Sequence, residues 1–189
     1  MHEVNRNIVT AAKAAMAMGL LVGLNACASS ADPHAMALST PATPDAKPFP
    51  PPLMHAMCVR SVTGGEETNP MWVSKVDNNG FKSALVTSLD SASLLSAADA
   101  TTCPFPIDVN LLGLSQPSMG FDMTVTSHVN YKVFDAGGSP FLLATIDAPY
   151  TAKMSEAFAG VERLKKANEG SIRTSIQQFF DKLRDSNPK

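Results

Sequence analysis

The chain has 189 residues, of which 44% are hydrophobic and 17% are charged, and it carries a formal net charge of −2. This length suits one domain with a real core. The 15 basic side chains form no stripe and are outnumbered by 17 acidic ones, so the sequence gives no support to nucleic-acid binding.

Residues 1–26 have the three parts of a secretory signal peptide. Arg6 and Lys13 make the start basic, an apolar run follows (AAMAMGLLVGL, residues 14–24), and small residues end the segment. The apolar run is shorter than the roughly 20 residues that a membrane-spanning helix needs, so the segment predicts export and not a permanent transmembrane helix.

The signal segment ends in Leu24-Asn25-Ala26-Cys27, which resembles the bacterial lipobox. In that motif the Cys is lipidated and becomes the new N-terminus; Asn25 departs from the usual Ala or Ser. We therefore predict lipidation of Cys27, with attachment to the membrane through acyl chains that each contribute about 0.8 kcal/mol per buried CH₂. The resemblance further implies sorting to the outer membrane, because Ala28 and not Asp follows the Cys. The alternative is plain secretion, with cleavage after Ala26 or Ala28.

Once Cys27 is assigned to lipid, Cys58 and Cys103 remain as an even pair in an oxidising compartment. This count predicts a disulfide between them. The alternative is a pair of buried thiols that never meet.

Residues 27–53 are rich in proline, with seven of the 14 prolines of the chain at positions 33, 41, 44, 48, 50, 51 and 52. Proline removes backbone donors and favours extended geometry. We predict a tether from the lipidated Cys27 to a globular domain over residues 54–186.

Within that domain, alternating or β-rich runs predict strands at about residues 55–62, 103–111, 121–133 and 140–150, with a hairpin turn at 135–139. Helical spacing predicts one helix at about 78–95 and a second along an apolar stripe from Phe158 to Leu183. Phe121 is expected on the buried face of its strand. Asn168 interrupts the last stripe and is expected to bond a backbone group, and Gly170 makes a kink or break conceivable there.

The order strand, helix, three strands, helix predicts an α+β fold. We expect a two-layer sandwich in which two helices cover one face of a four-stranded, largely antiparallel sheet. The other face would carry polar residues around His128.

The sequence contains no GxSxG and no HExxH motif, and the histidines after residue 26 (His34, His55 and His128) are scattered. We therefore predict no catalytic residue, no metal site and no cofactor. His128 and Asp122 could share one strand face, which an exposed polar ladder explains. Arg163, Lys165 and Lys166 are interpreted as the solvated side of the last helix or, alternatively, as a contact for acidic headgroups or lipopolysaccharide phosphates.

Several segments resemble a group of short, poorly characterised Gram-negative envelope lipoproteins, over about residues 56–184. The matching stretches are NPMW (69–72), FKSAL (81–85), QP (116–117), GFDMTV (120–125), AFAGVERL (157–164) and ANEG (167–170). Members of such groups sometimes carry the name UDP-N-acetylglucosamine acyltransferase, but the hexapeptide repeats of that enzyme's β-helix are absent here. The element order is also similar to small outer-membrane assembly lipoproteins, which is a likeness of fold alone.

The sequence thus predicts a membrane-anchored, periplasm-facing, non-enzymatic lipoprotein that binds a protein or glycolipid partner in envelope assembly or maintenance. Its expected partners are the membrane, through the lipid anchor, and an unknown envelope protein or glycolipid, but no nucleic acid. Two alternatives remain open. One is an enzyme acting on envelope glycan or lipid, and the other is a small-ligand carrier with an apolar cavity between helices and sheet.

Overall fold

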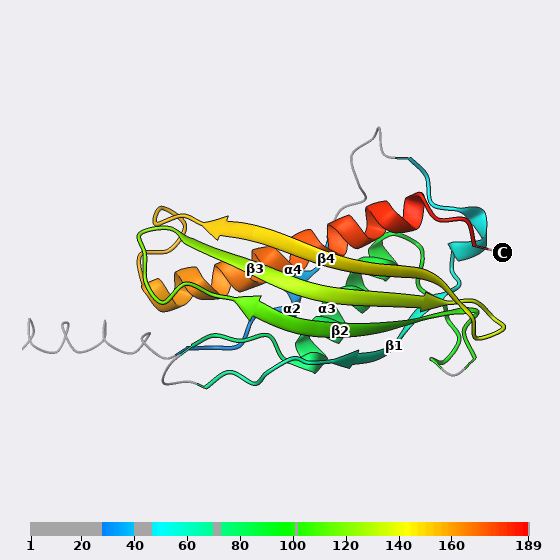
Figure 1. Ribbon diagram of the computed structural model, residues 1–189, viewed down its shortest axis with the longest axis horizontal. Coiled ribbons are helices and arrows are strands. Elements are labelled where there is room, and N and C mark those ends of the chain that lie inside the picture. The colour runs from blue at the N-terminus through cyan, green and yellow to red at the C-terminus, as the bar shows by residue number, and fades with distance from the viewer. Residues whose placement is uncertain (1–27, 40–46, 70–72, 101, 189) are drawn as a thin grey trace, which may run out of the picture.

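The computed structural model of the protein describes residues 28–39, 47–69, 73–100 and 102–188. The predicted signal peptide 1–26 and Cys27 lie outside the described residues. Four strands form one sheet in the order β1–β2–β3–β4: β1 (Met57–Thr63), β2 (Phe105–Ser115), β3 (Met123–Phe134) and β4 (Pro140–Ala152). Helices α3 (Asn78–Ser91) and α4 (Gly160–Arg184) cover one face of this sheet (Figure 1).

This arrangement confirms the predicted α+β sandwich, with a sheet that is mixed. β2, β3 and β4 are antiparallel neighbours, whereas β1 pairs with β2 in parallel. The parallel pair follows from the chain order, because α3 connects β1 to β2 and carries the chain back to the same end of the sheet. Alternating apolar side chains of β2 and β3 face the helices and are buried: Ile107, Val109, Leu111, Val125, Val129, Tyr131 and Val133.

Helix α3 starts where the sequence predicts and ends earlier. The side chain of Asp77 accepts a hydrogen bond from the backbone N–H of Gly80 at 2.8 Å, which caps the first turn. The chain leaves the helix after Ser91 because Ser93 adopts a left-handed conformation with φ 57°. The predicted end near Leu95 is therefore too late.

Helix α4 runs from Gly160 to Arg184 without a break at Gly170. Its apolar stripe is buried as predicted: Leu164, Ile172, Ile176, Phe179 and Leu183. Phe158 was expected to begin this stripe and Phe121 to begin the buried face of β3, and both expectations are wrong. The helix and the strand start only at Gly160 and Met123, so both rings lie in the preceding loops and point to solvent.

Gly170 is the point of closest approach between α4 and the sheet. A Cβ atom at this position would lie 2.3 Å from the ring of Tyr150 on β4. The next residue, Ser171, bonds both β3 and β4: its Oγ donates to the carbonyl of Ala148 at 2.9 Å and accepts the N–H of Ser127 at 2.8 Å. Small residues therefore let the helix backbone lie directly on β3 and β4.

The segment predicted as a tether is largely part of the folded structure. Its described residues include α2 (Pro33–Met36) and the short 3₁₀ helix η2 (Pro51–Leu53), and the side chains of Met36 and Leu53 are fully buried in the main core. Proline content predicted an extended backbone, but apolar side chains between the prolines gain more by packing on α3 and α4 than by remaining in water.

The predicted disulfide is present and joins Cys58 of β1 to Cys103, which lies just before β2. It closes a loop with a sequence separation of 45 that contains all of α3. In the chain-entropy model, a disulfide that closes a loop of this size stabilises the fold by about 4 kcal/mol.

We predict that Gly170→Ala lowers the free energy of unfolding by about 1–3 kcal/mol, because the added methyl group must displace the Tyr150 ring or the helix. Urea denaturation monitored by circular dichroism measures this change. Gly160→Ala is the matched control, since its Cβ would have its nearest neighbour at an ordinary 3.5 Å. Equal stability of the two variants would show that α4 can shift on the sheet at little cost.

Candidate functional site

One end of the molecule presents large apolar side chains to solvent. The β2–β3 loop (116–122) and the β4–α4 loop (153–159) both lie at this end, on the left in Figure 1. Met119, Phe121 and Phe158 are 84%, 81% and 87% exposed, and Met154 is exposed as well. We call these four residues the apolar end. They are four of the seven large hydrophobic residues that are exposed in the described part of the chain.

The two loops of the apolar end are fixed to one another by a buried arginine. Nη1 of Arg163 donates to the carbonyls of Ala157 and Phe158 at 2.7 and 2.8 Å, and Nη2 donates to the carbonyl of Gly120 at 3.2 Å. A second link joins the backbone N–H of Met154 to the carboxylate of Asp122 at 3.0 Å. Both loops are therefore held in place, although their apolar tips are in water.

This role corrects both interpretations of Arg163 from the sequence, as part of the solvated side of the helix and as a partner contact. The guanidinium is buried because three loop carbonyls need donors. Lys165 is half-buried, with its Nζ 3.9 Å from the carboxylate of Glu169. Of the three predicted contact residues, only Lys166 is exposed.

A groove of about 450 Å³ lies beside the apolar end, between the β2–β3 loop and the start of α4. Its volume is in the range of small-molecule sites. Most of the lining is apolar or small: Val73, Gln116, Pro117, Ser118, Met119, Gly120, Met123, Gly160, Val161 and Leu164.

The residues that follow Cys27 are linked to this groove through a partly buried polar network. The carbonyl of Ser29 accepts a hydrogen bond from Oγ of Ser74 at 2.8 Å. The carbonyl of Ser74 in turn accepts from Nδ2 of Asn168 at 2.8 Å and from Nε2 of Gln116, a groove residue, at 3.0 Å. The predicted backbone bond of Asn168 is thus confirmed, and it connects α4 to the loop that binds the start of the described chain.

Further contacts fix the same segment along α4 and α3. The N–H of Asp32 donates to Oε1 of Glu169 at 2.9 Å, and Nη1 of Arg173 donates to the carbonyl of Ala35 at 2.6 Å. The N–H of Leu38 donates to Oγ of Ser88 at 2.9 Å. Residues 28–38 are therefore docked over their length and are not a free spacer.

Burial raises the pKa of the Glu169 carboxyl above its ordinary value of 4.5, against the opposing effects of the Asp32 N–H and of Lys165. A carboxyl with a raised pKa binds its proton more tightly in the folded chain than in the unfolded chain. Its contribution to stability is therefore present below pH 4.5 and is lost as the pH rises through the folded-state pKa.

We predict that Glu169→Gln is more stable than the wild type at neutral pH, because the amide oxygen can still accept the Asp32 N–H without a buried charge. The difference should disappear when the pH falls below 4.5, where the wild-type carboxyl is protonated in both states. Denaturation midpoints across this pH range test the sign. Glu162→Gln, at an exposed position in the first turn of α4, controls for the change in net charge. A wild type that gains stability over the variant as the pH rises would contradict the assignment.

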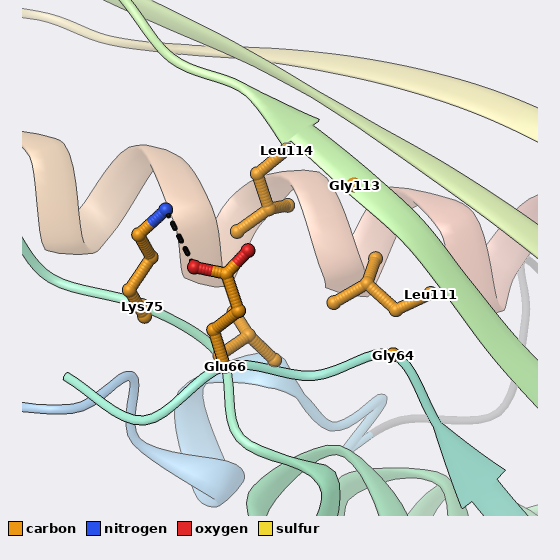
Figure 2. Close-up of a pocket in the computed structure, with 7 residues that line it drawn as sticks. Gly64, Glu66, Lys75, Leu111, Gly113 and Leu114 are labelled. Atoms are coloured by element: carbon orange, nitrogen blue, oxygen red, sulfur yellow. Dashed lines mark ion pairs between the residues drawn. The ribbon is translucent and has the colours of Figure 1, made fainter.

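A second, smaller cavity of about 150 Å³ lies between β2 and the loop after β1. Figure 2 shows Glu66 and Lys75 pointing toward one another beside Leu114, with 3.1 Å between the carboxylate and the ammonium. The loop passes close to β2 at Gly64, where a Cβ would lie 2.1 Å from the carbonyl of Leu111. The ion pair joins two loop segments and leaves no charged group of the lining unpaired, so this cavity gives no sign of a binding site.

The open face of the sheet carries a hydrogen-bonded row of Ser115, His128 and Asp147 across β2, β3 and β4. Oγ of Ser115 lies 2.9 Å from Nε2 of His128, and Nδ1 of His128 lies 2.7 Å from Oδ1 of Asp147. The expected neighbour of His128, Asp122, lies instead in the β2–β3 loop. Sequence reasoning missed Asp147, because counting symmetrically from the predicted turn 135–139 pairs position 128 with 146, and the register shift between Val133 and Phe134 brings 147 opposite 128 instead.

The Ser115–His128–Asp147 row has the order of a nucleophile, a base and an orienting acid. However, the His128 and Asp147 side chains are 36% and 66% exposed, and neither cavity includes the row in its lining. Similar cross-strand pairs lie on the same strands, with 2.8 Å between the hydroxyls of Thr124 and Thr151. The row is thus explained as one rung of a polar ladder on a wet sheet face.

No protein-family model matches the sequence, and no curated protein matches it. The chain is similar in structure to the Xanthomonas campestris protein XCC0632, of the family model DUF330, with a TM-score of 0.53, 11% identity, and coverage of 84% of this chain and 98% of that one. This likeness shows a shared fold.

Weaker likenesses link the chain to two further solved structures. CT253 from Chlamydia trachomatis has a TM-score of 0.48 and 10% identity over 68% of this chain and 94% of its own. A minor lipoprotein from Acinetobacter baumannii has a TM-score of 0.43 and 12% identity over 73% of this chain and 100% of its own. Within the described residues, none of the helices has the length and apolar character needed to cross a membrane.

Proposed function

We propose that the protein is a lipoprotein of the bacterial cell envelope, anchored through Cys27 and facing the periplasm from the outer membrane. Its α+β domain acts without catalysis, by binding a protein or glycolipid partner in envelope assembly or maintenance. The observation that supports this proposal best is the docking of residues 28–38 on the domain, directly after the lipobox cysteine.

Because residues 28–38 are docked on the domain, the fold would determine where an anchor at Cys27 lies. The carbonyl of Ser29, two residues after Cys27, is held by Ser74, and the N–H of Asp32 is held by Glu169. A lipid on Cys27 would therefore leave the domain at a fixed place and would keep the domain close to the membrane. The disulfide between Cys58 and Cys103 suits the oxidising compartment that this location implies.

We predict that the protein extracted from membranes begins with an acylated Cys27. Mass spectrometry of the N-terminal peptide measures the added acyl mass, and cell fractionation should show that Cys27→Ser moves to the soluble fraction. Cys58→Ser is the matched control, since this residue forms the disulfide and has no part in the anchor. An N-terminal peptide that begins at unmodified Cys27 or at Ser29 would contradict the anchor.

The partner can be sought from the same anchored protein. Photo-crosslinking groups at exposed positions, for example Lys166 on α4 and Leu143 on β4, would capture a neighbouring protein or glycolipid in intact envelopes. Capture of one defined species at one position and not at the other would support a specific binding surface. Random capture at both positions would argue against it.

A second candidate function is hydrolysis of an ester or amide in envelope glycan or lipid, and the Ser115–His128–Asp147 row favours it. In such a reaction Oγ of Ser115 would attack the acyl carbon while its proton passes to Nε2 of His128, and the same proton would then go to the leaving group. Water would next attack the acyl-Ser115 ester, giving its proton through His128 to Oγ, and would release the acid. The exposure of His128 and Asp147 argues against this function, because charge that develops in water gains little from nearby side chains.

We predict that a fluorophosphonate probe does not label Ser115 above the background set by Ser115→Ala, since the row is open to water. Labelling is measured by intact-protein mass spectrometry. Ser139→Ala, at an exposed position in the β3–β4 turn, is the matched control. Stoichiometric labelling that is lost in Ser115→Ala and kept in Ser139→Ala would replace the non-enzymatic proposal by a hydrolase.

A further inference from the structure

We propose that the apolar end is a membrane-contact surface, whose side chains enter the boundary between headgroups and acyl chains of the bilayer that holds Cys27. The inference rests on the proposed anchor and adds a specific surface and a specific orientation of the domain. Its ligand class is phospholipid, bound through apolar insertion.

The first observation is the concentration of exposed apolar side chains. Met119 and Phe121 extend from one loop, and Met154 and Phe158 extend from the neighbouring one. Exposed apolar side chains that occur singly are ordinary, whereas a group of four on adjoining loops marks an interaction site. Aromatic and long aliphatic side chains of this kind are those that bind in the interface of a bilayer.

The second observation is that these side chains are presented by a fixed framework. Arg163 is buried, and its guanidinium holds one carbonyl of the first loop and two of the second. Flexible loops with apolar tips could fold back onto the domain, but loops held in this way keep their tips outward. The structure thus keeps the apolar surface exposed, and the cost is the desolvation of the buried Arg163 guanidinium.

The third observation is the position of the chain immediately after Cys27. Ser29 contacts Ser74, and Ser74 contacts Gln116 in the groove that Met119 also lines. Only Ala28 separates Ser29 from Cys27, and successive Cα atoms lie about 3.8 Å apart. Acyl chains on Cys27 would thus leave the protein at the same end of the molecule as the apolar side chains.

The charges of the two loops favour an apolar insertion over an electrostatic contact. Their carboxylates already accept backbone N–H groups, from Met154 for Asp122 and from Lys153 for Glu156. Lys153 is the one cation within these loops. Because the loops have no excess of positive charge, the contact should persist at high salt.

The test uses the chain that begins at acylated Cys27, in vesicles of phosphatidylethanolamine and phosphatidylglycerol. Nitroxide labels are placed at Phe121→Cys and Phe158→Cys, with Leu143→Cys as the matched control. All three positions are exposed, so the labels should leave the fold intact. Leu143 is the fourth residue of β4 and lies beside the β3–β4 turn, at the other end of the strand from the apolar end. Collision rates with oxygen, which concentrates in lipid, and with a water-soluble nickel chelate report the depth of each label.

We expect labels at positions 121 and 158 to show a severalfold gain in oxygen collisions and a severalfold loss of nickel collisions on binding to vesicles, unchanged at high salt. The label at 143 should remain accessible to nickel. Nickel accessibility at 121 and 158 equal to that at 143 would overturn the inference while leaving the anchor intact. Protection from both reagents would also overturn it, because that result indicates a protein contact such as a second copy. A Cys27 peptide without acyl mass would overturn the proposed anchor and the inference with it.

Discussion

The close contact of α4 with β3 and β4 at Gly170 and Ser171 is the constraint on which the other parts of the structure depend. A larger residue at position 170 would collide with Tyr150. The side chain of Ser171 makes hydrogen bonds to the strands, which the backbone groups inside a helix cannot make because they are already paired with one another. Stacking of Tyr131 on Phe179, with ring centroids 4.2 Å apart, continues the contact toward the C-terminal half of the helix. The register of the helix on the sheet is therefore fixed at several points.

Once α4 is in register, its polar side chains fix segments that are distant in sequence. Arg163 binds the two loops of the apolar end, and Asn168 binds the loop at Ser74. Glu169 and Arg173 bind the residues that follow Cys27. Arg163, Asn168 and Glu169 are buried at a cost in desolvation, and each has hydrogen-bonded partners, which is how such groups specify one arrangement among several. The helix thus couples residues 28–38 to the apolar end.

Periodicity predicted the elements of this fold well, because side chains in strands and helices face the core at fixed intervals. It failed where the apolar pattern continued past the element, as at Phe121 and Phe158, since spacing does not show where a strand or helix begins. Proline content led to the wrong prediction that residues 28–39 and 47–53 are a tether. Prolines restrict the backbone, but they do not indicate whether neighbouring side chains such as Met36 and Leu53 are buried in the core. The Ser115–His128–Asp147 row needed the strand register, and the contacts of Arg163 needed the loop geometry, neither of which a single sequence displays.

Under the proposed membrane contact, the length of β4 sets how far the domain extends from the bilayer. The strand has 13 residues and ends at the apolar end, while its other end meets the β3–β4 turn. At about 3.3 Å per residue, a strand of this length spans about 40 Å. A domain that stands on the bilayer by its apolar end would hold the 135–139 turn at about that height in the periplasm. Strand length, and not a flexible linker, would then define the layer of the periplasm in which partners are met.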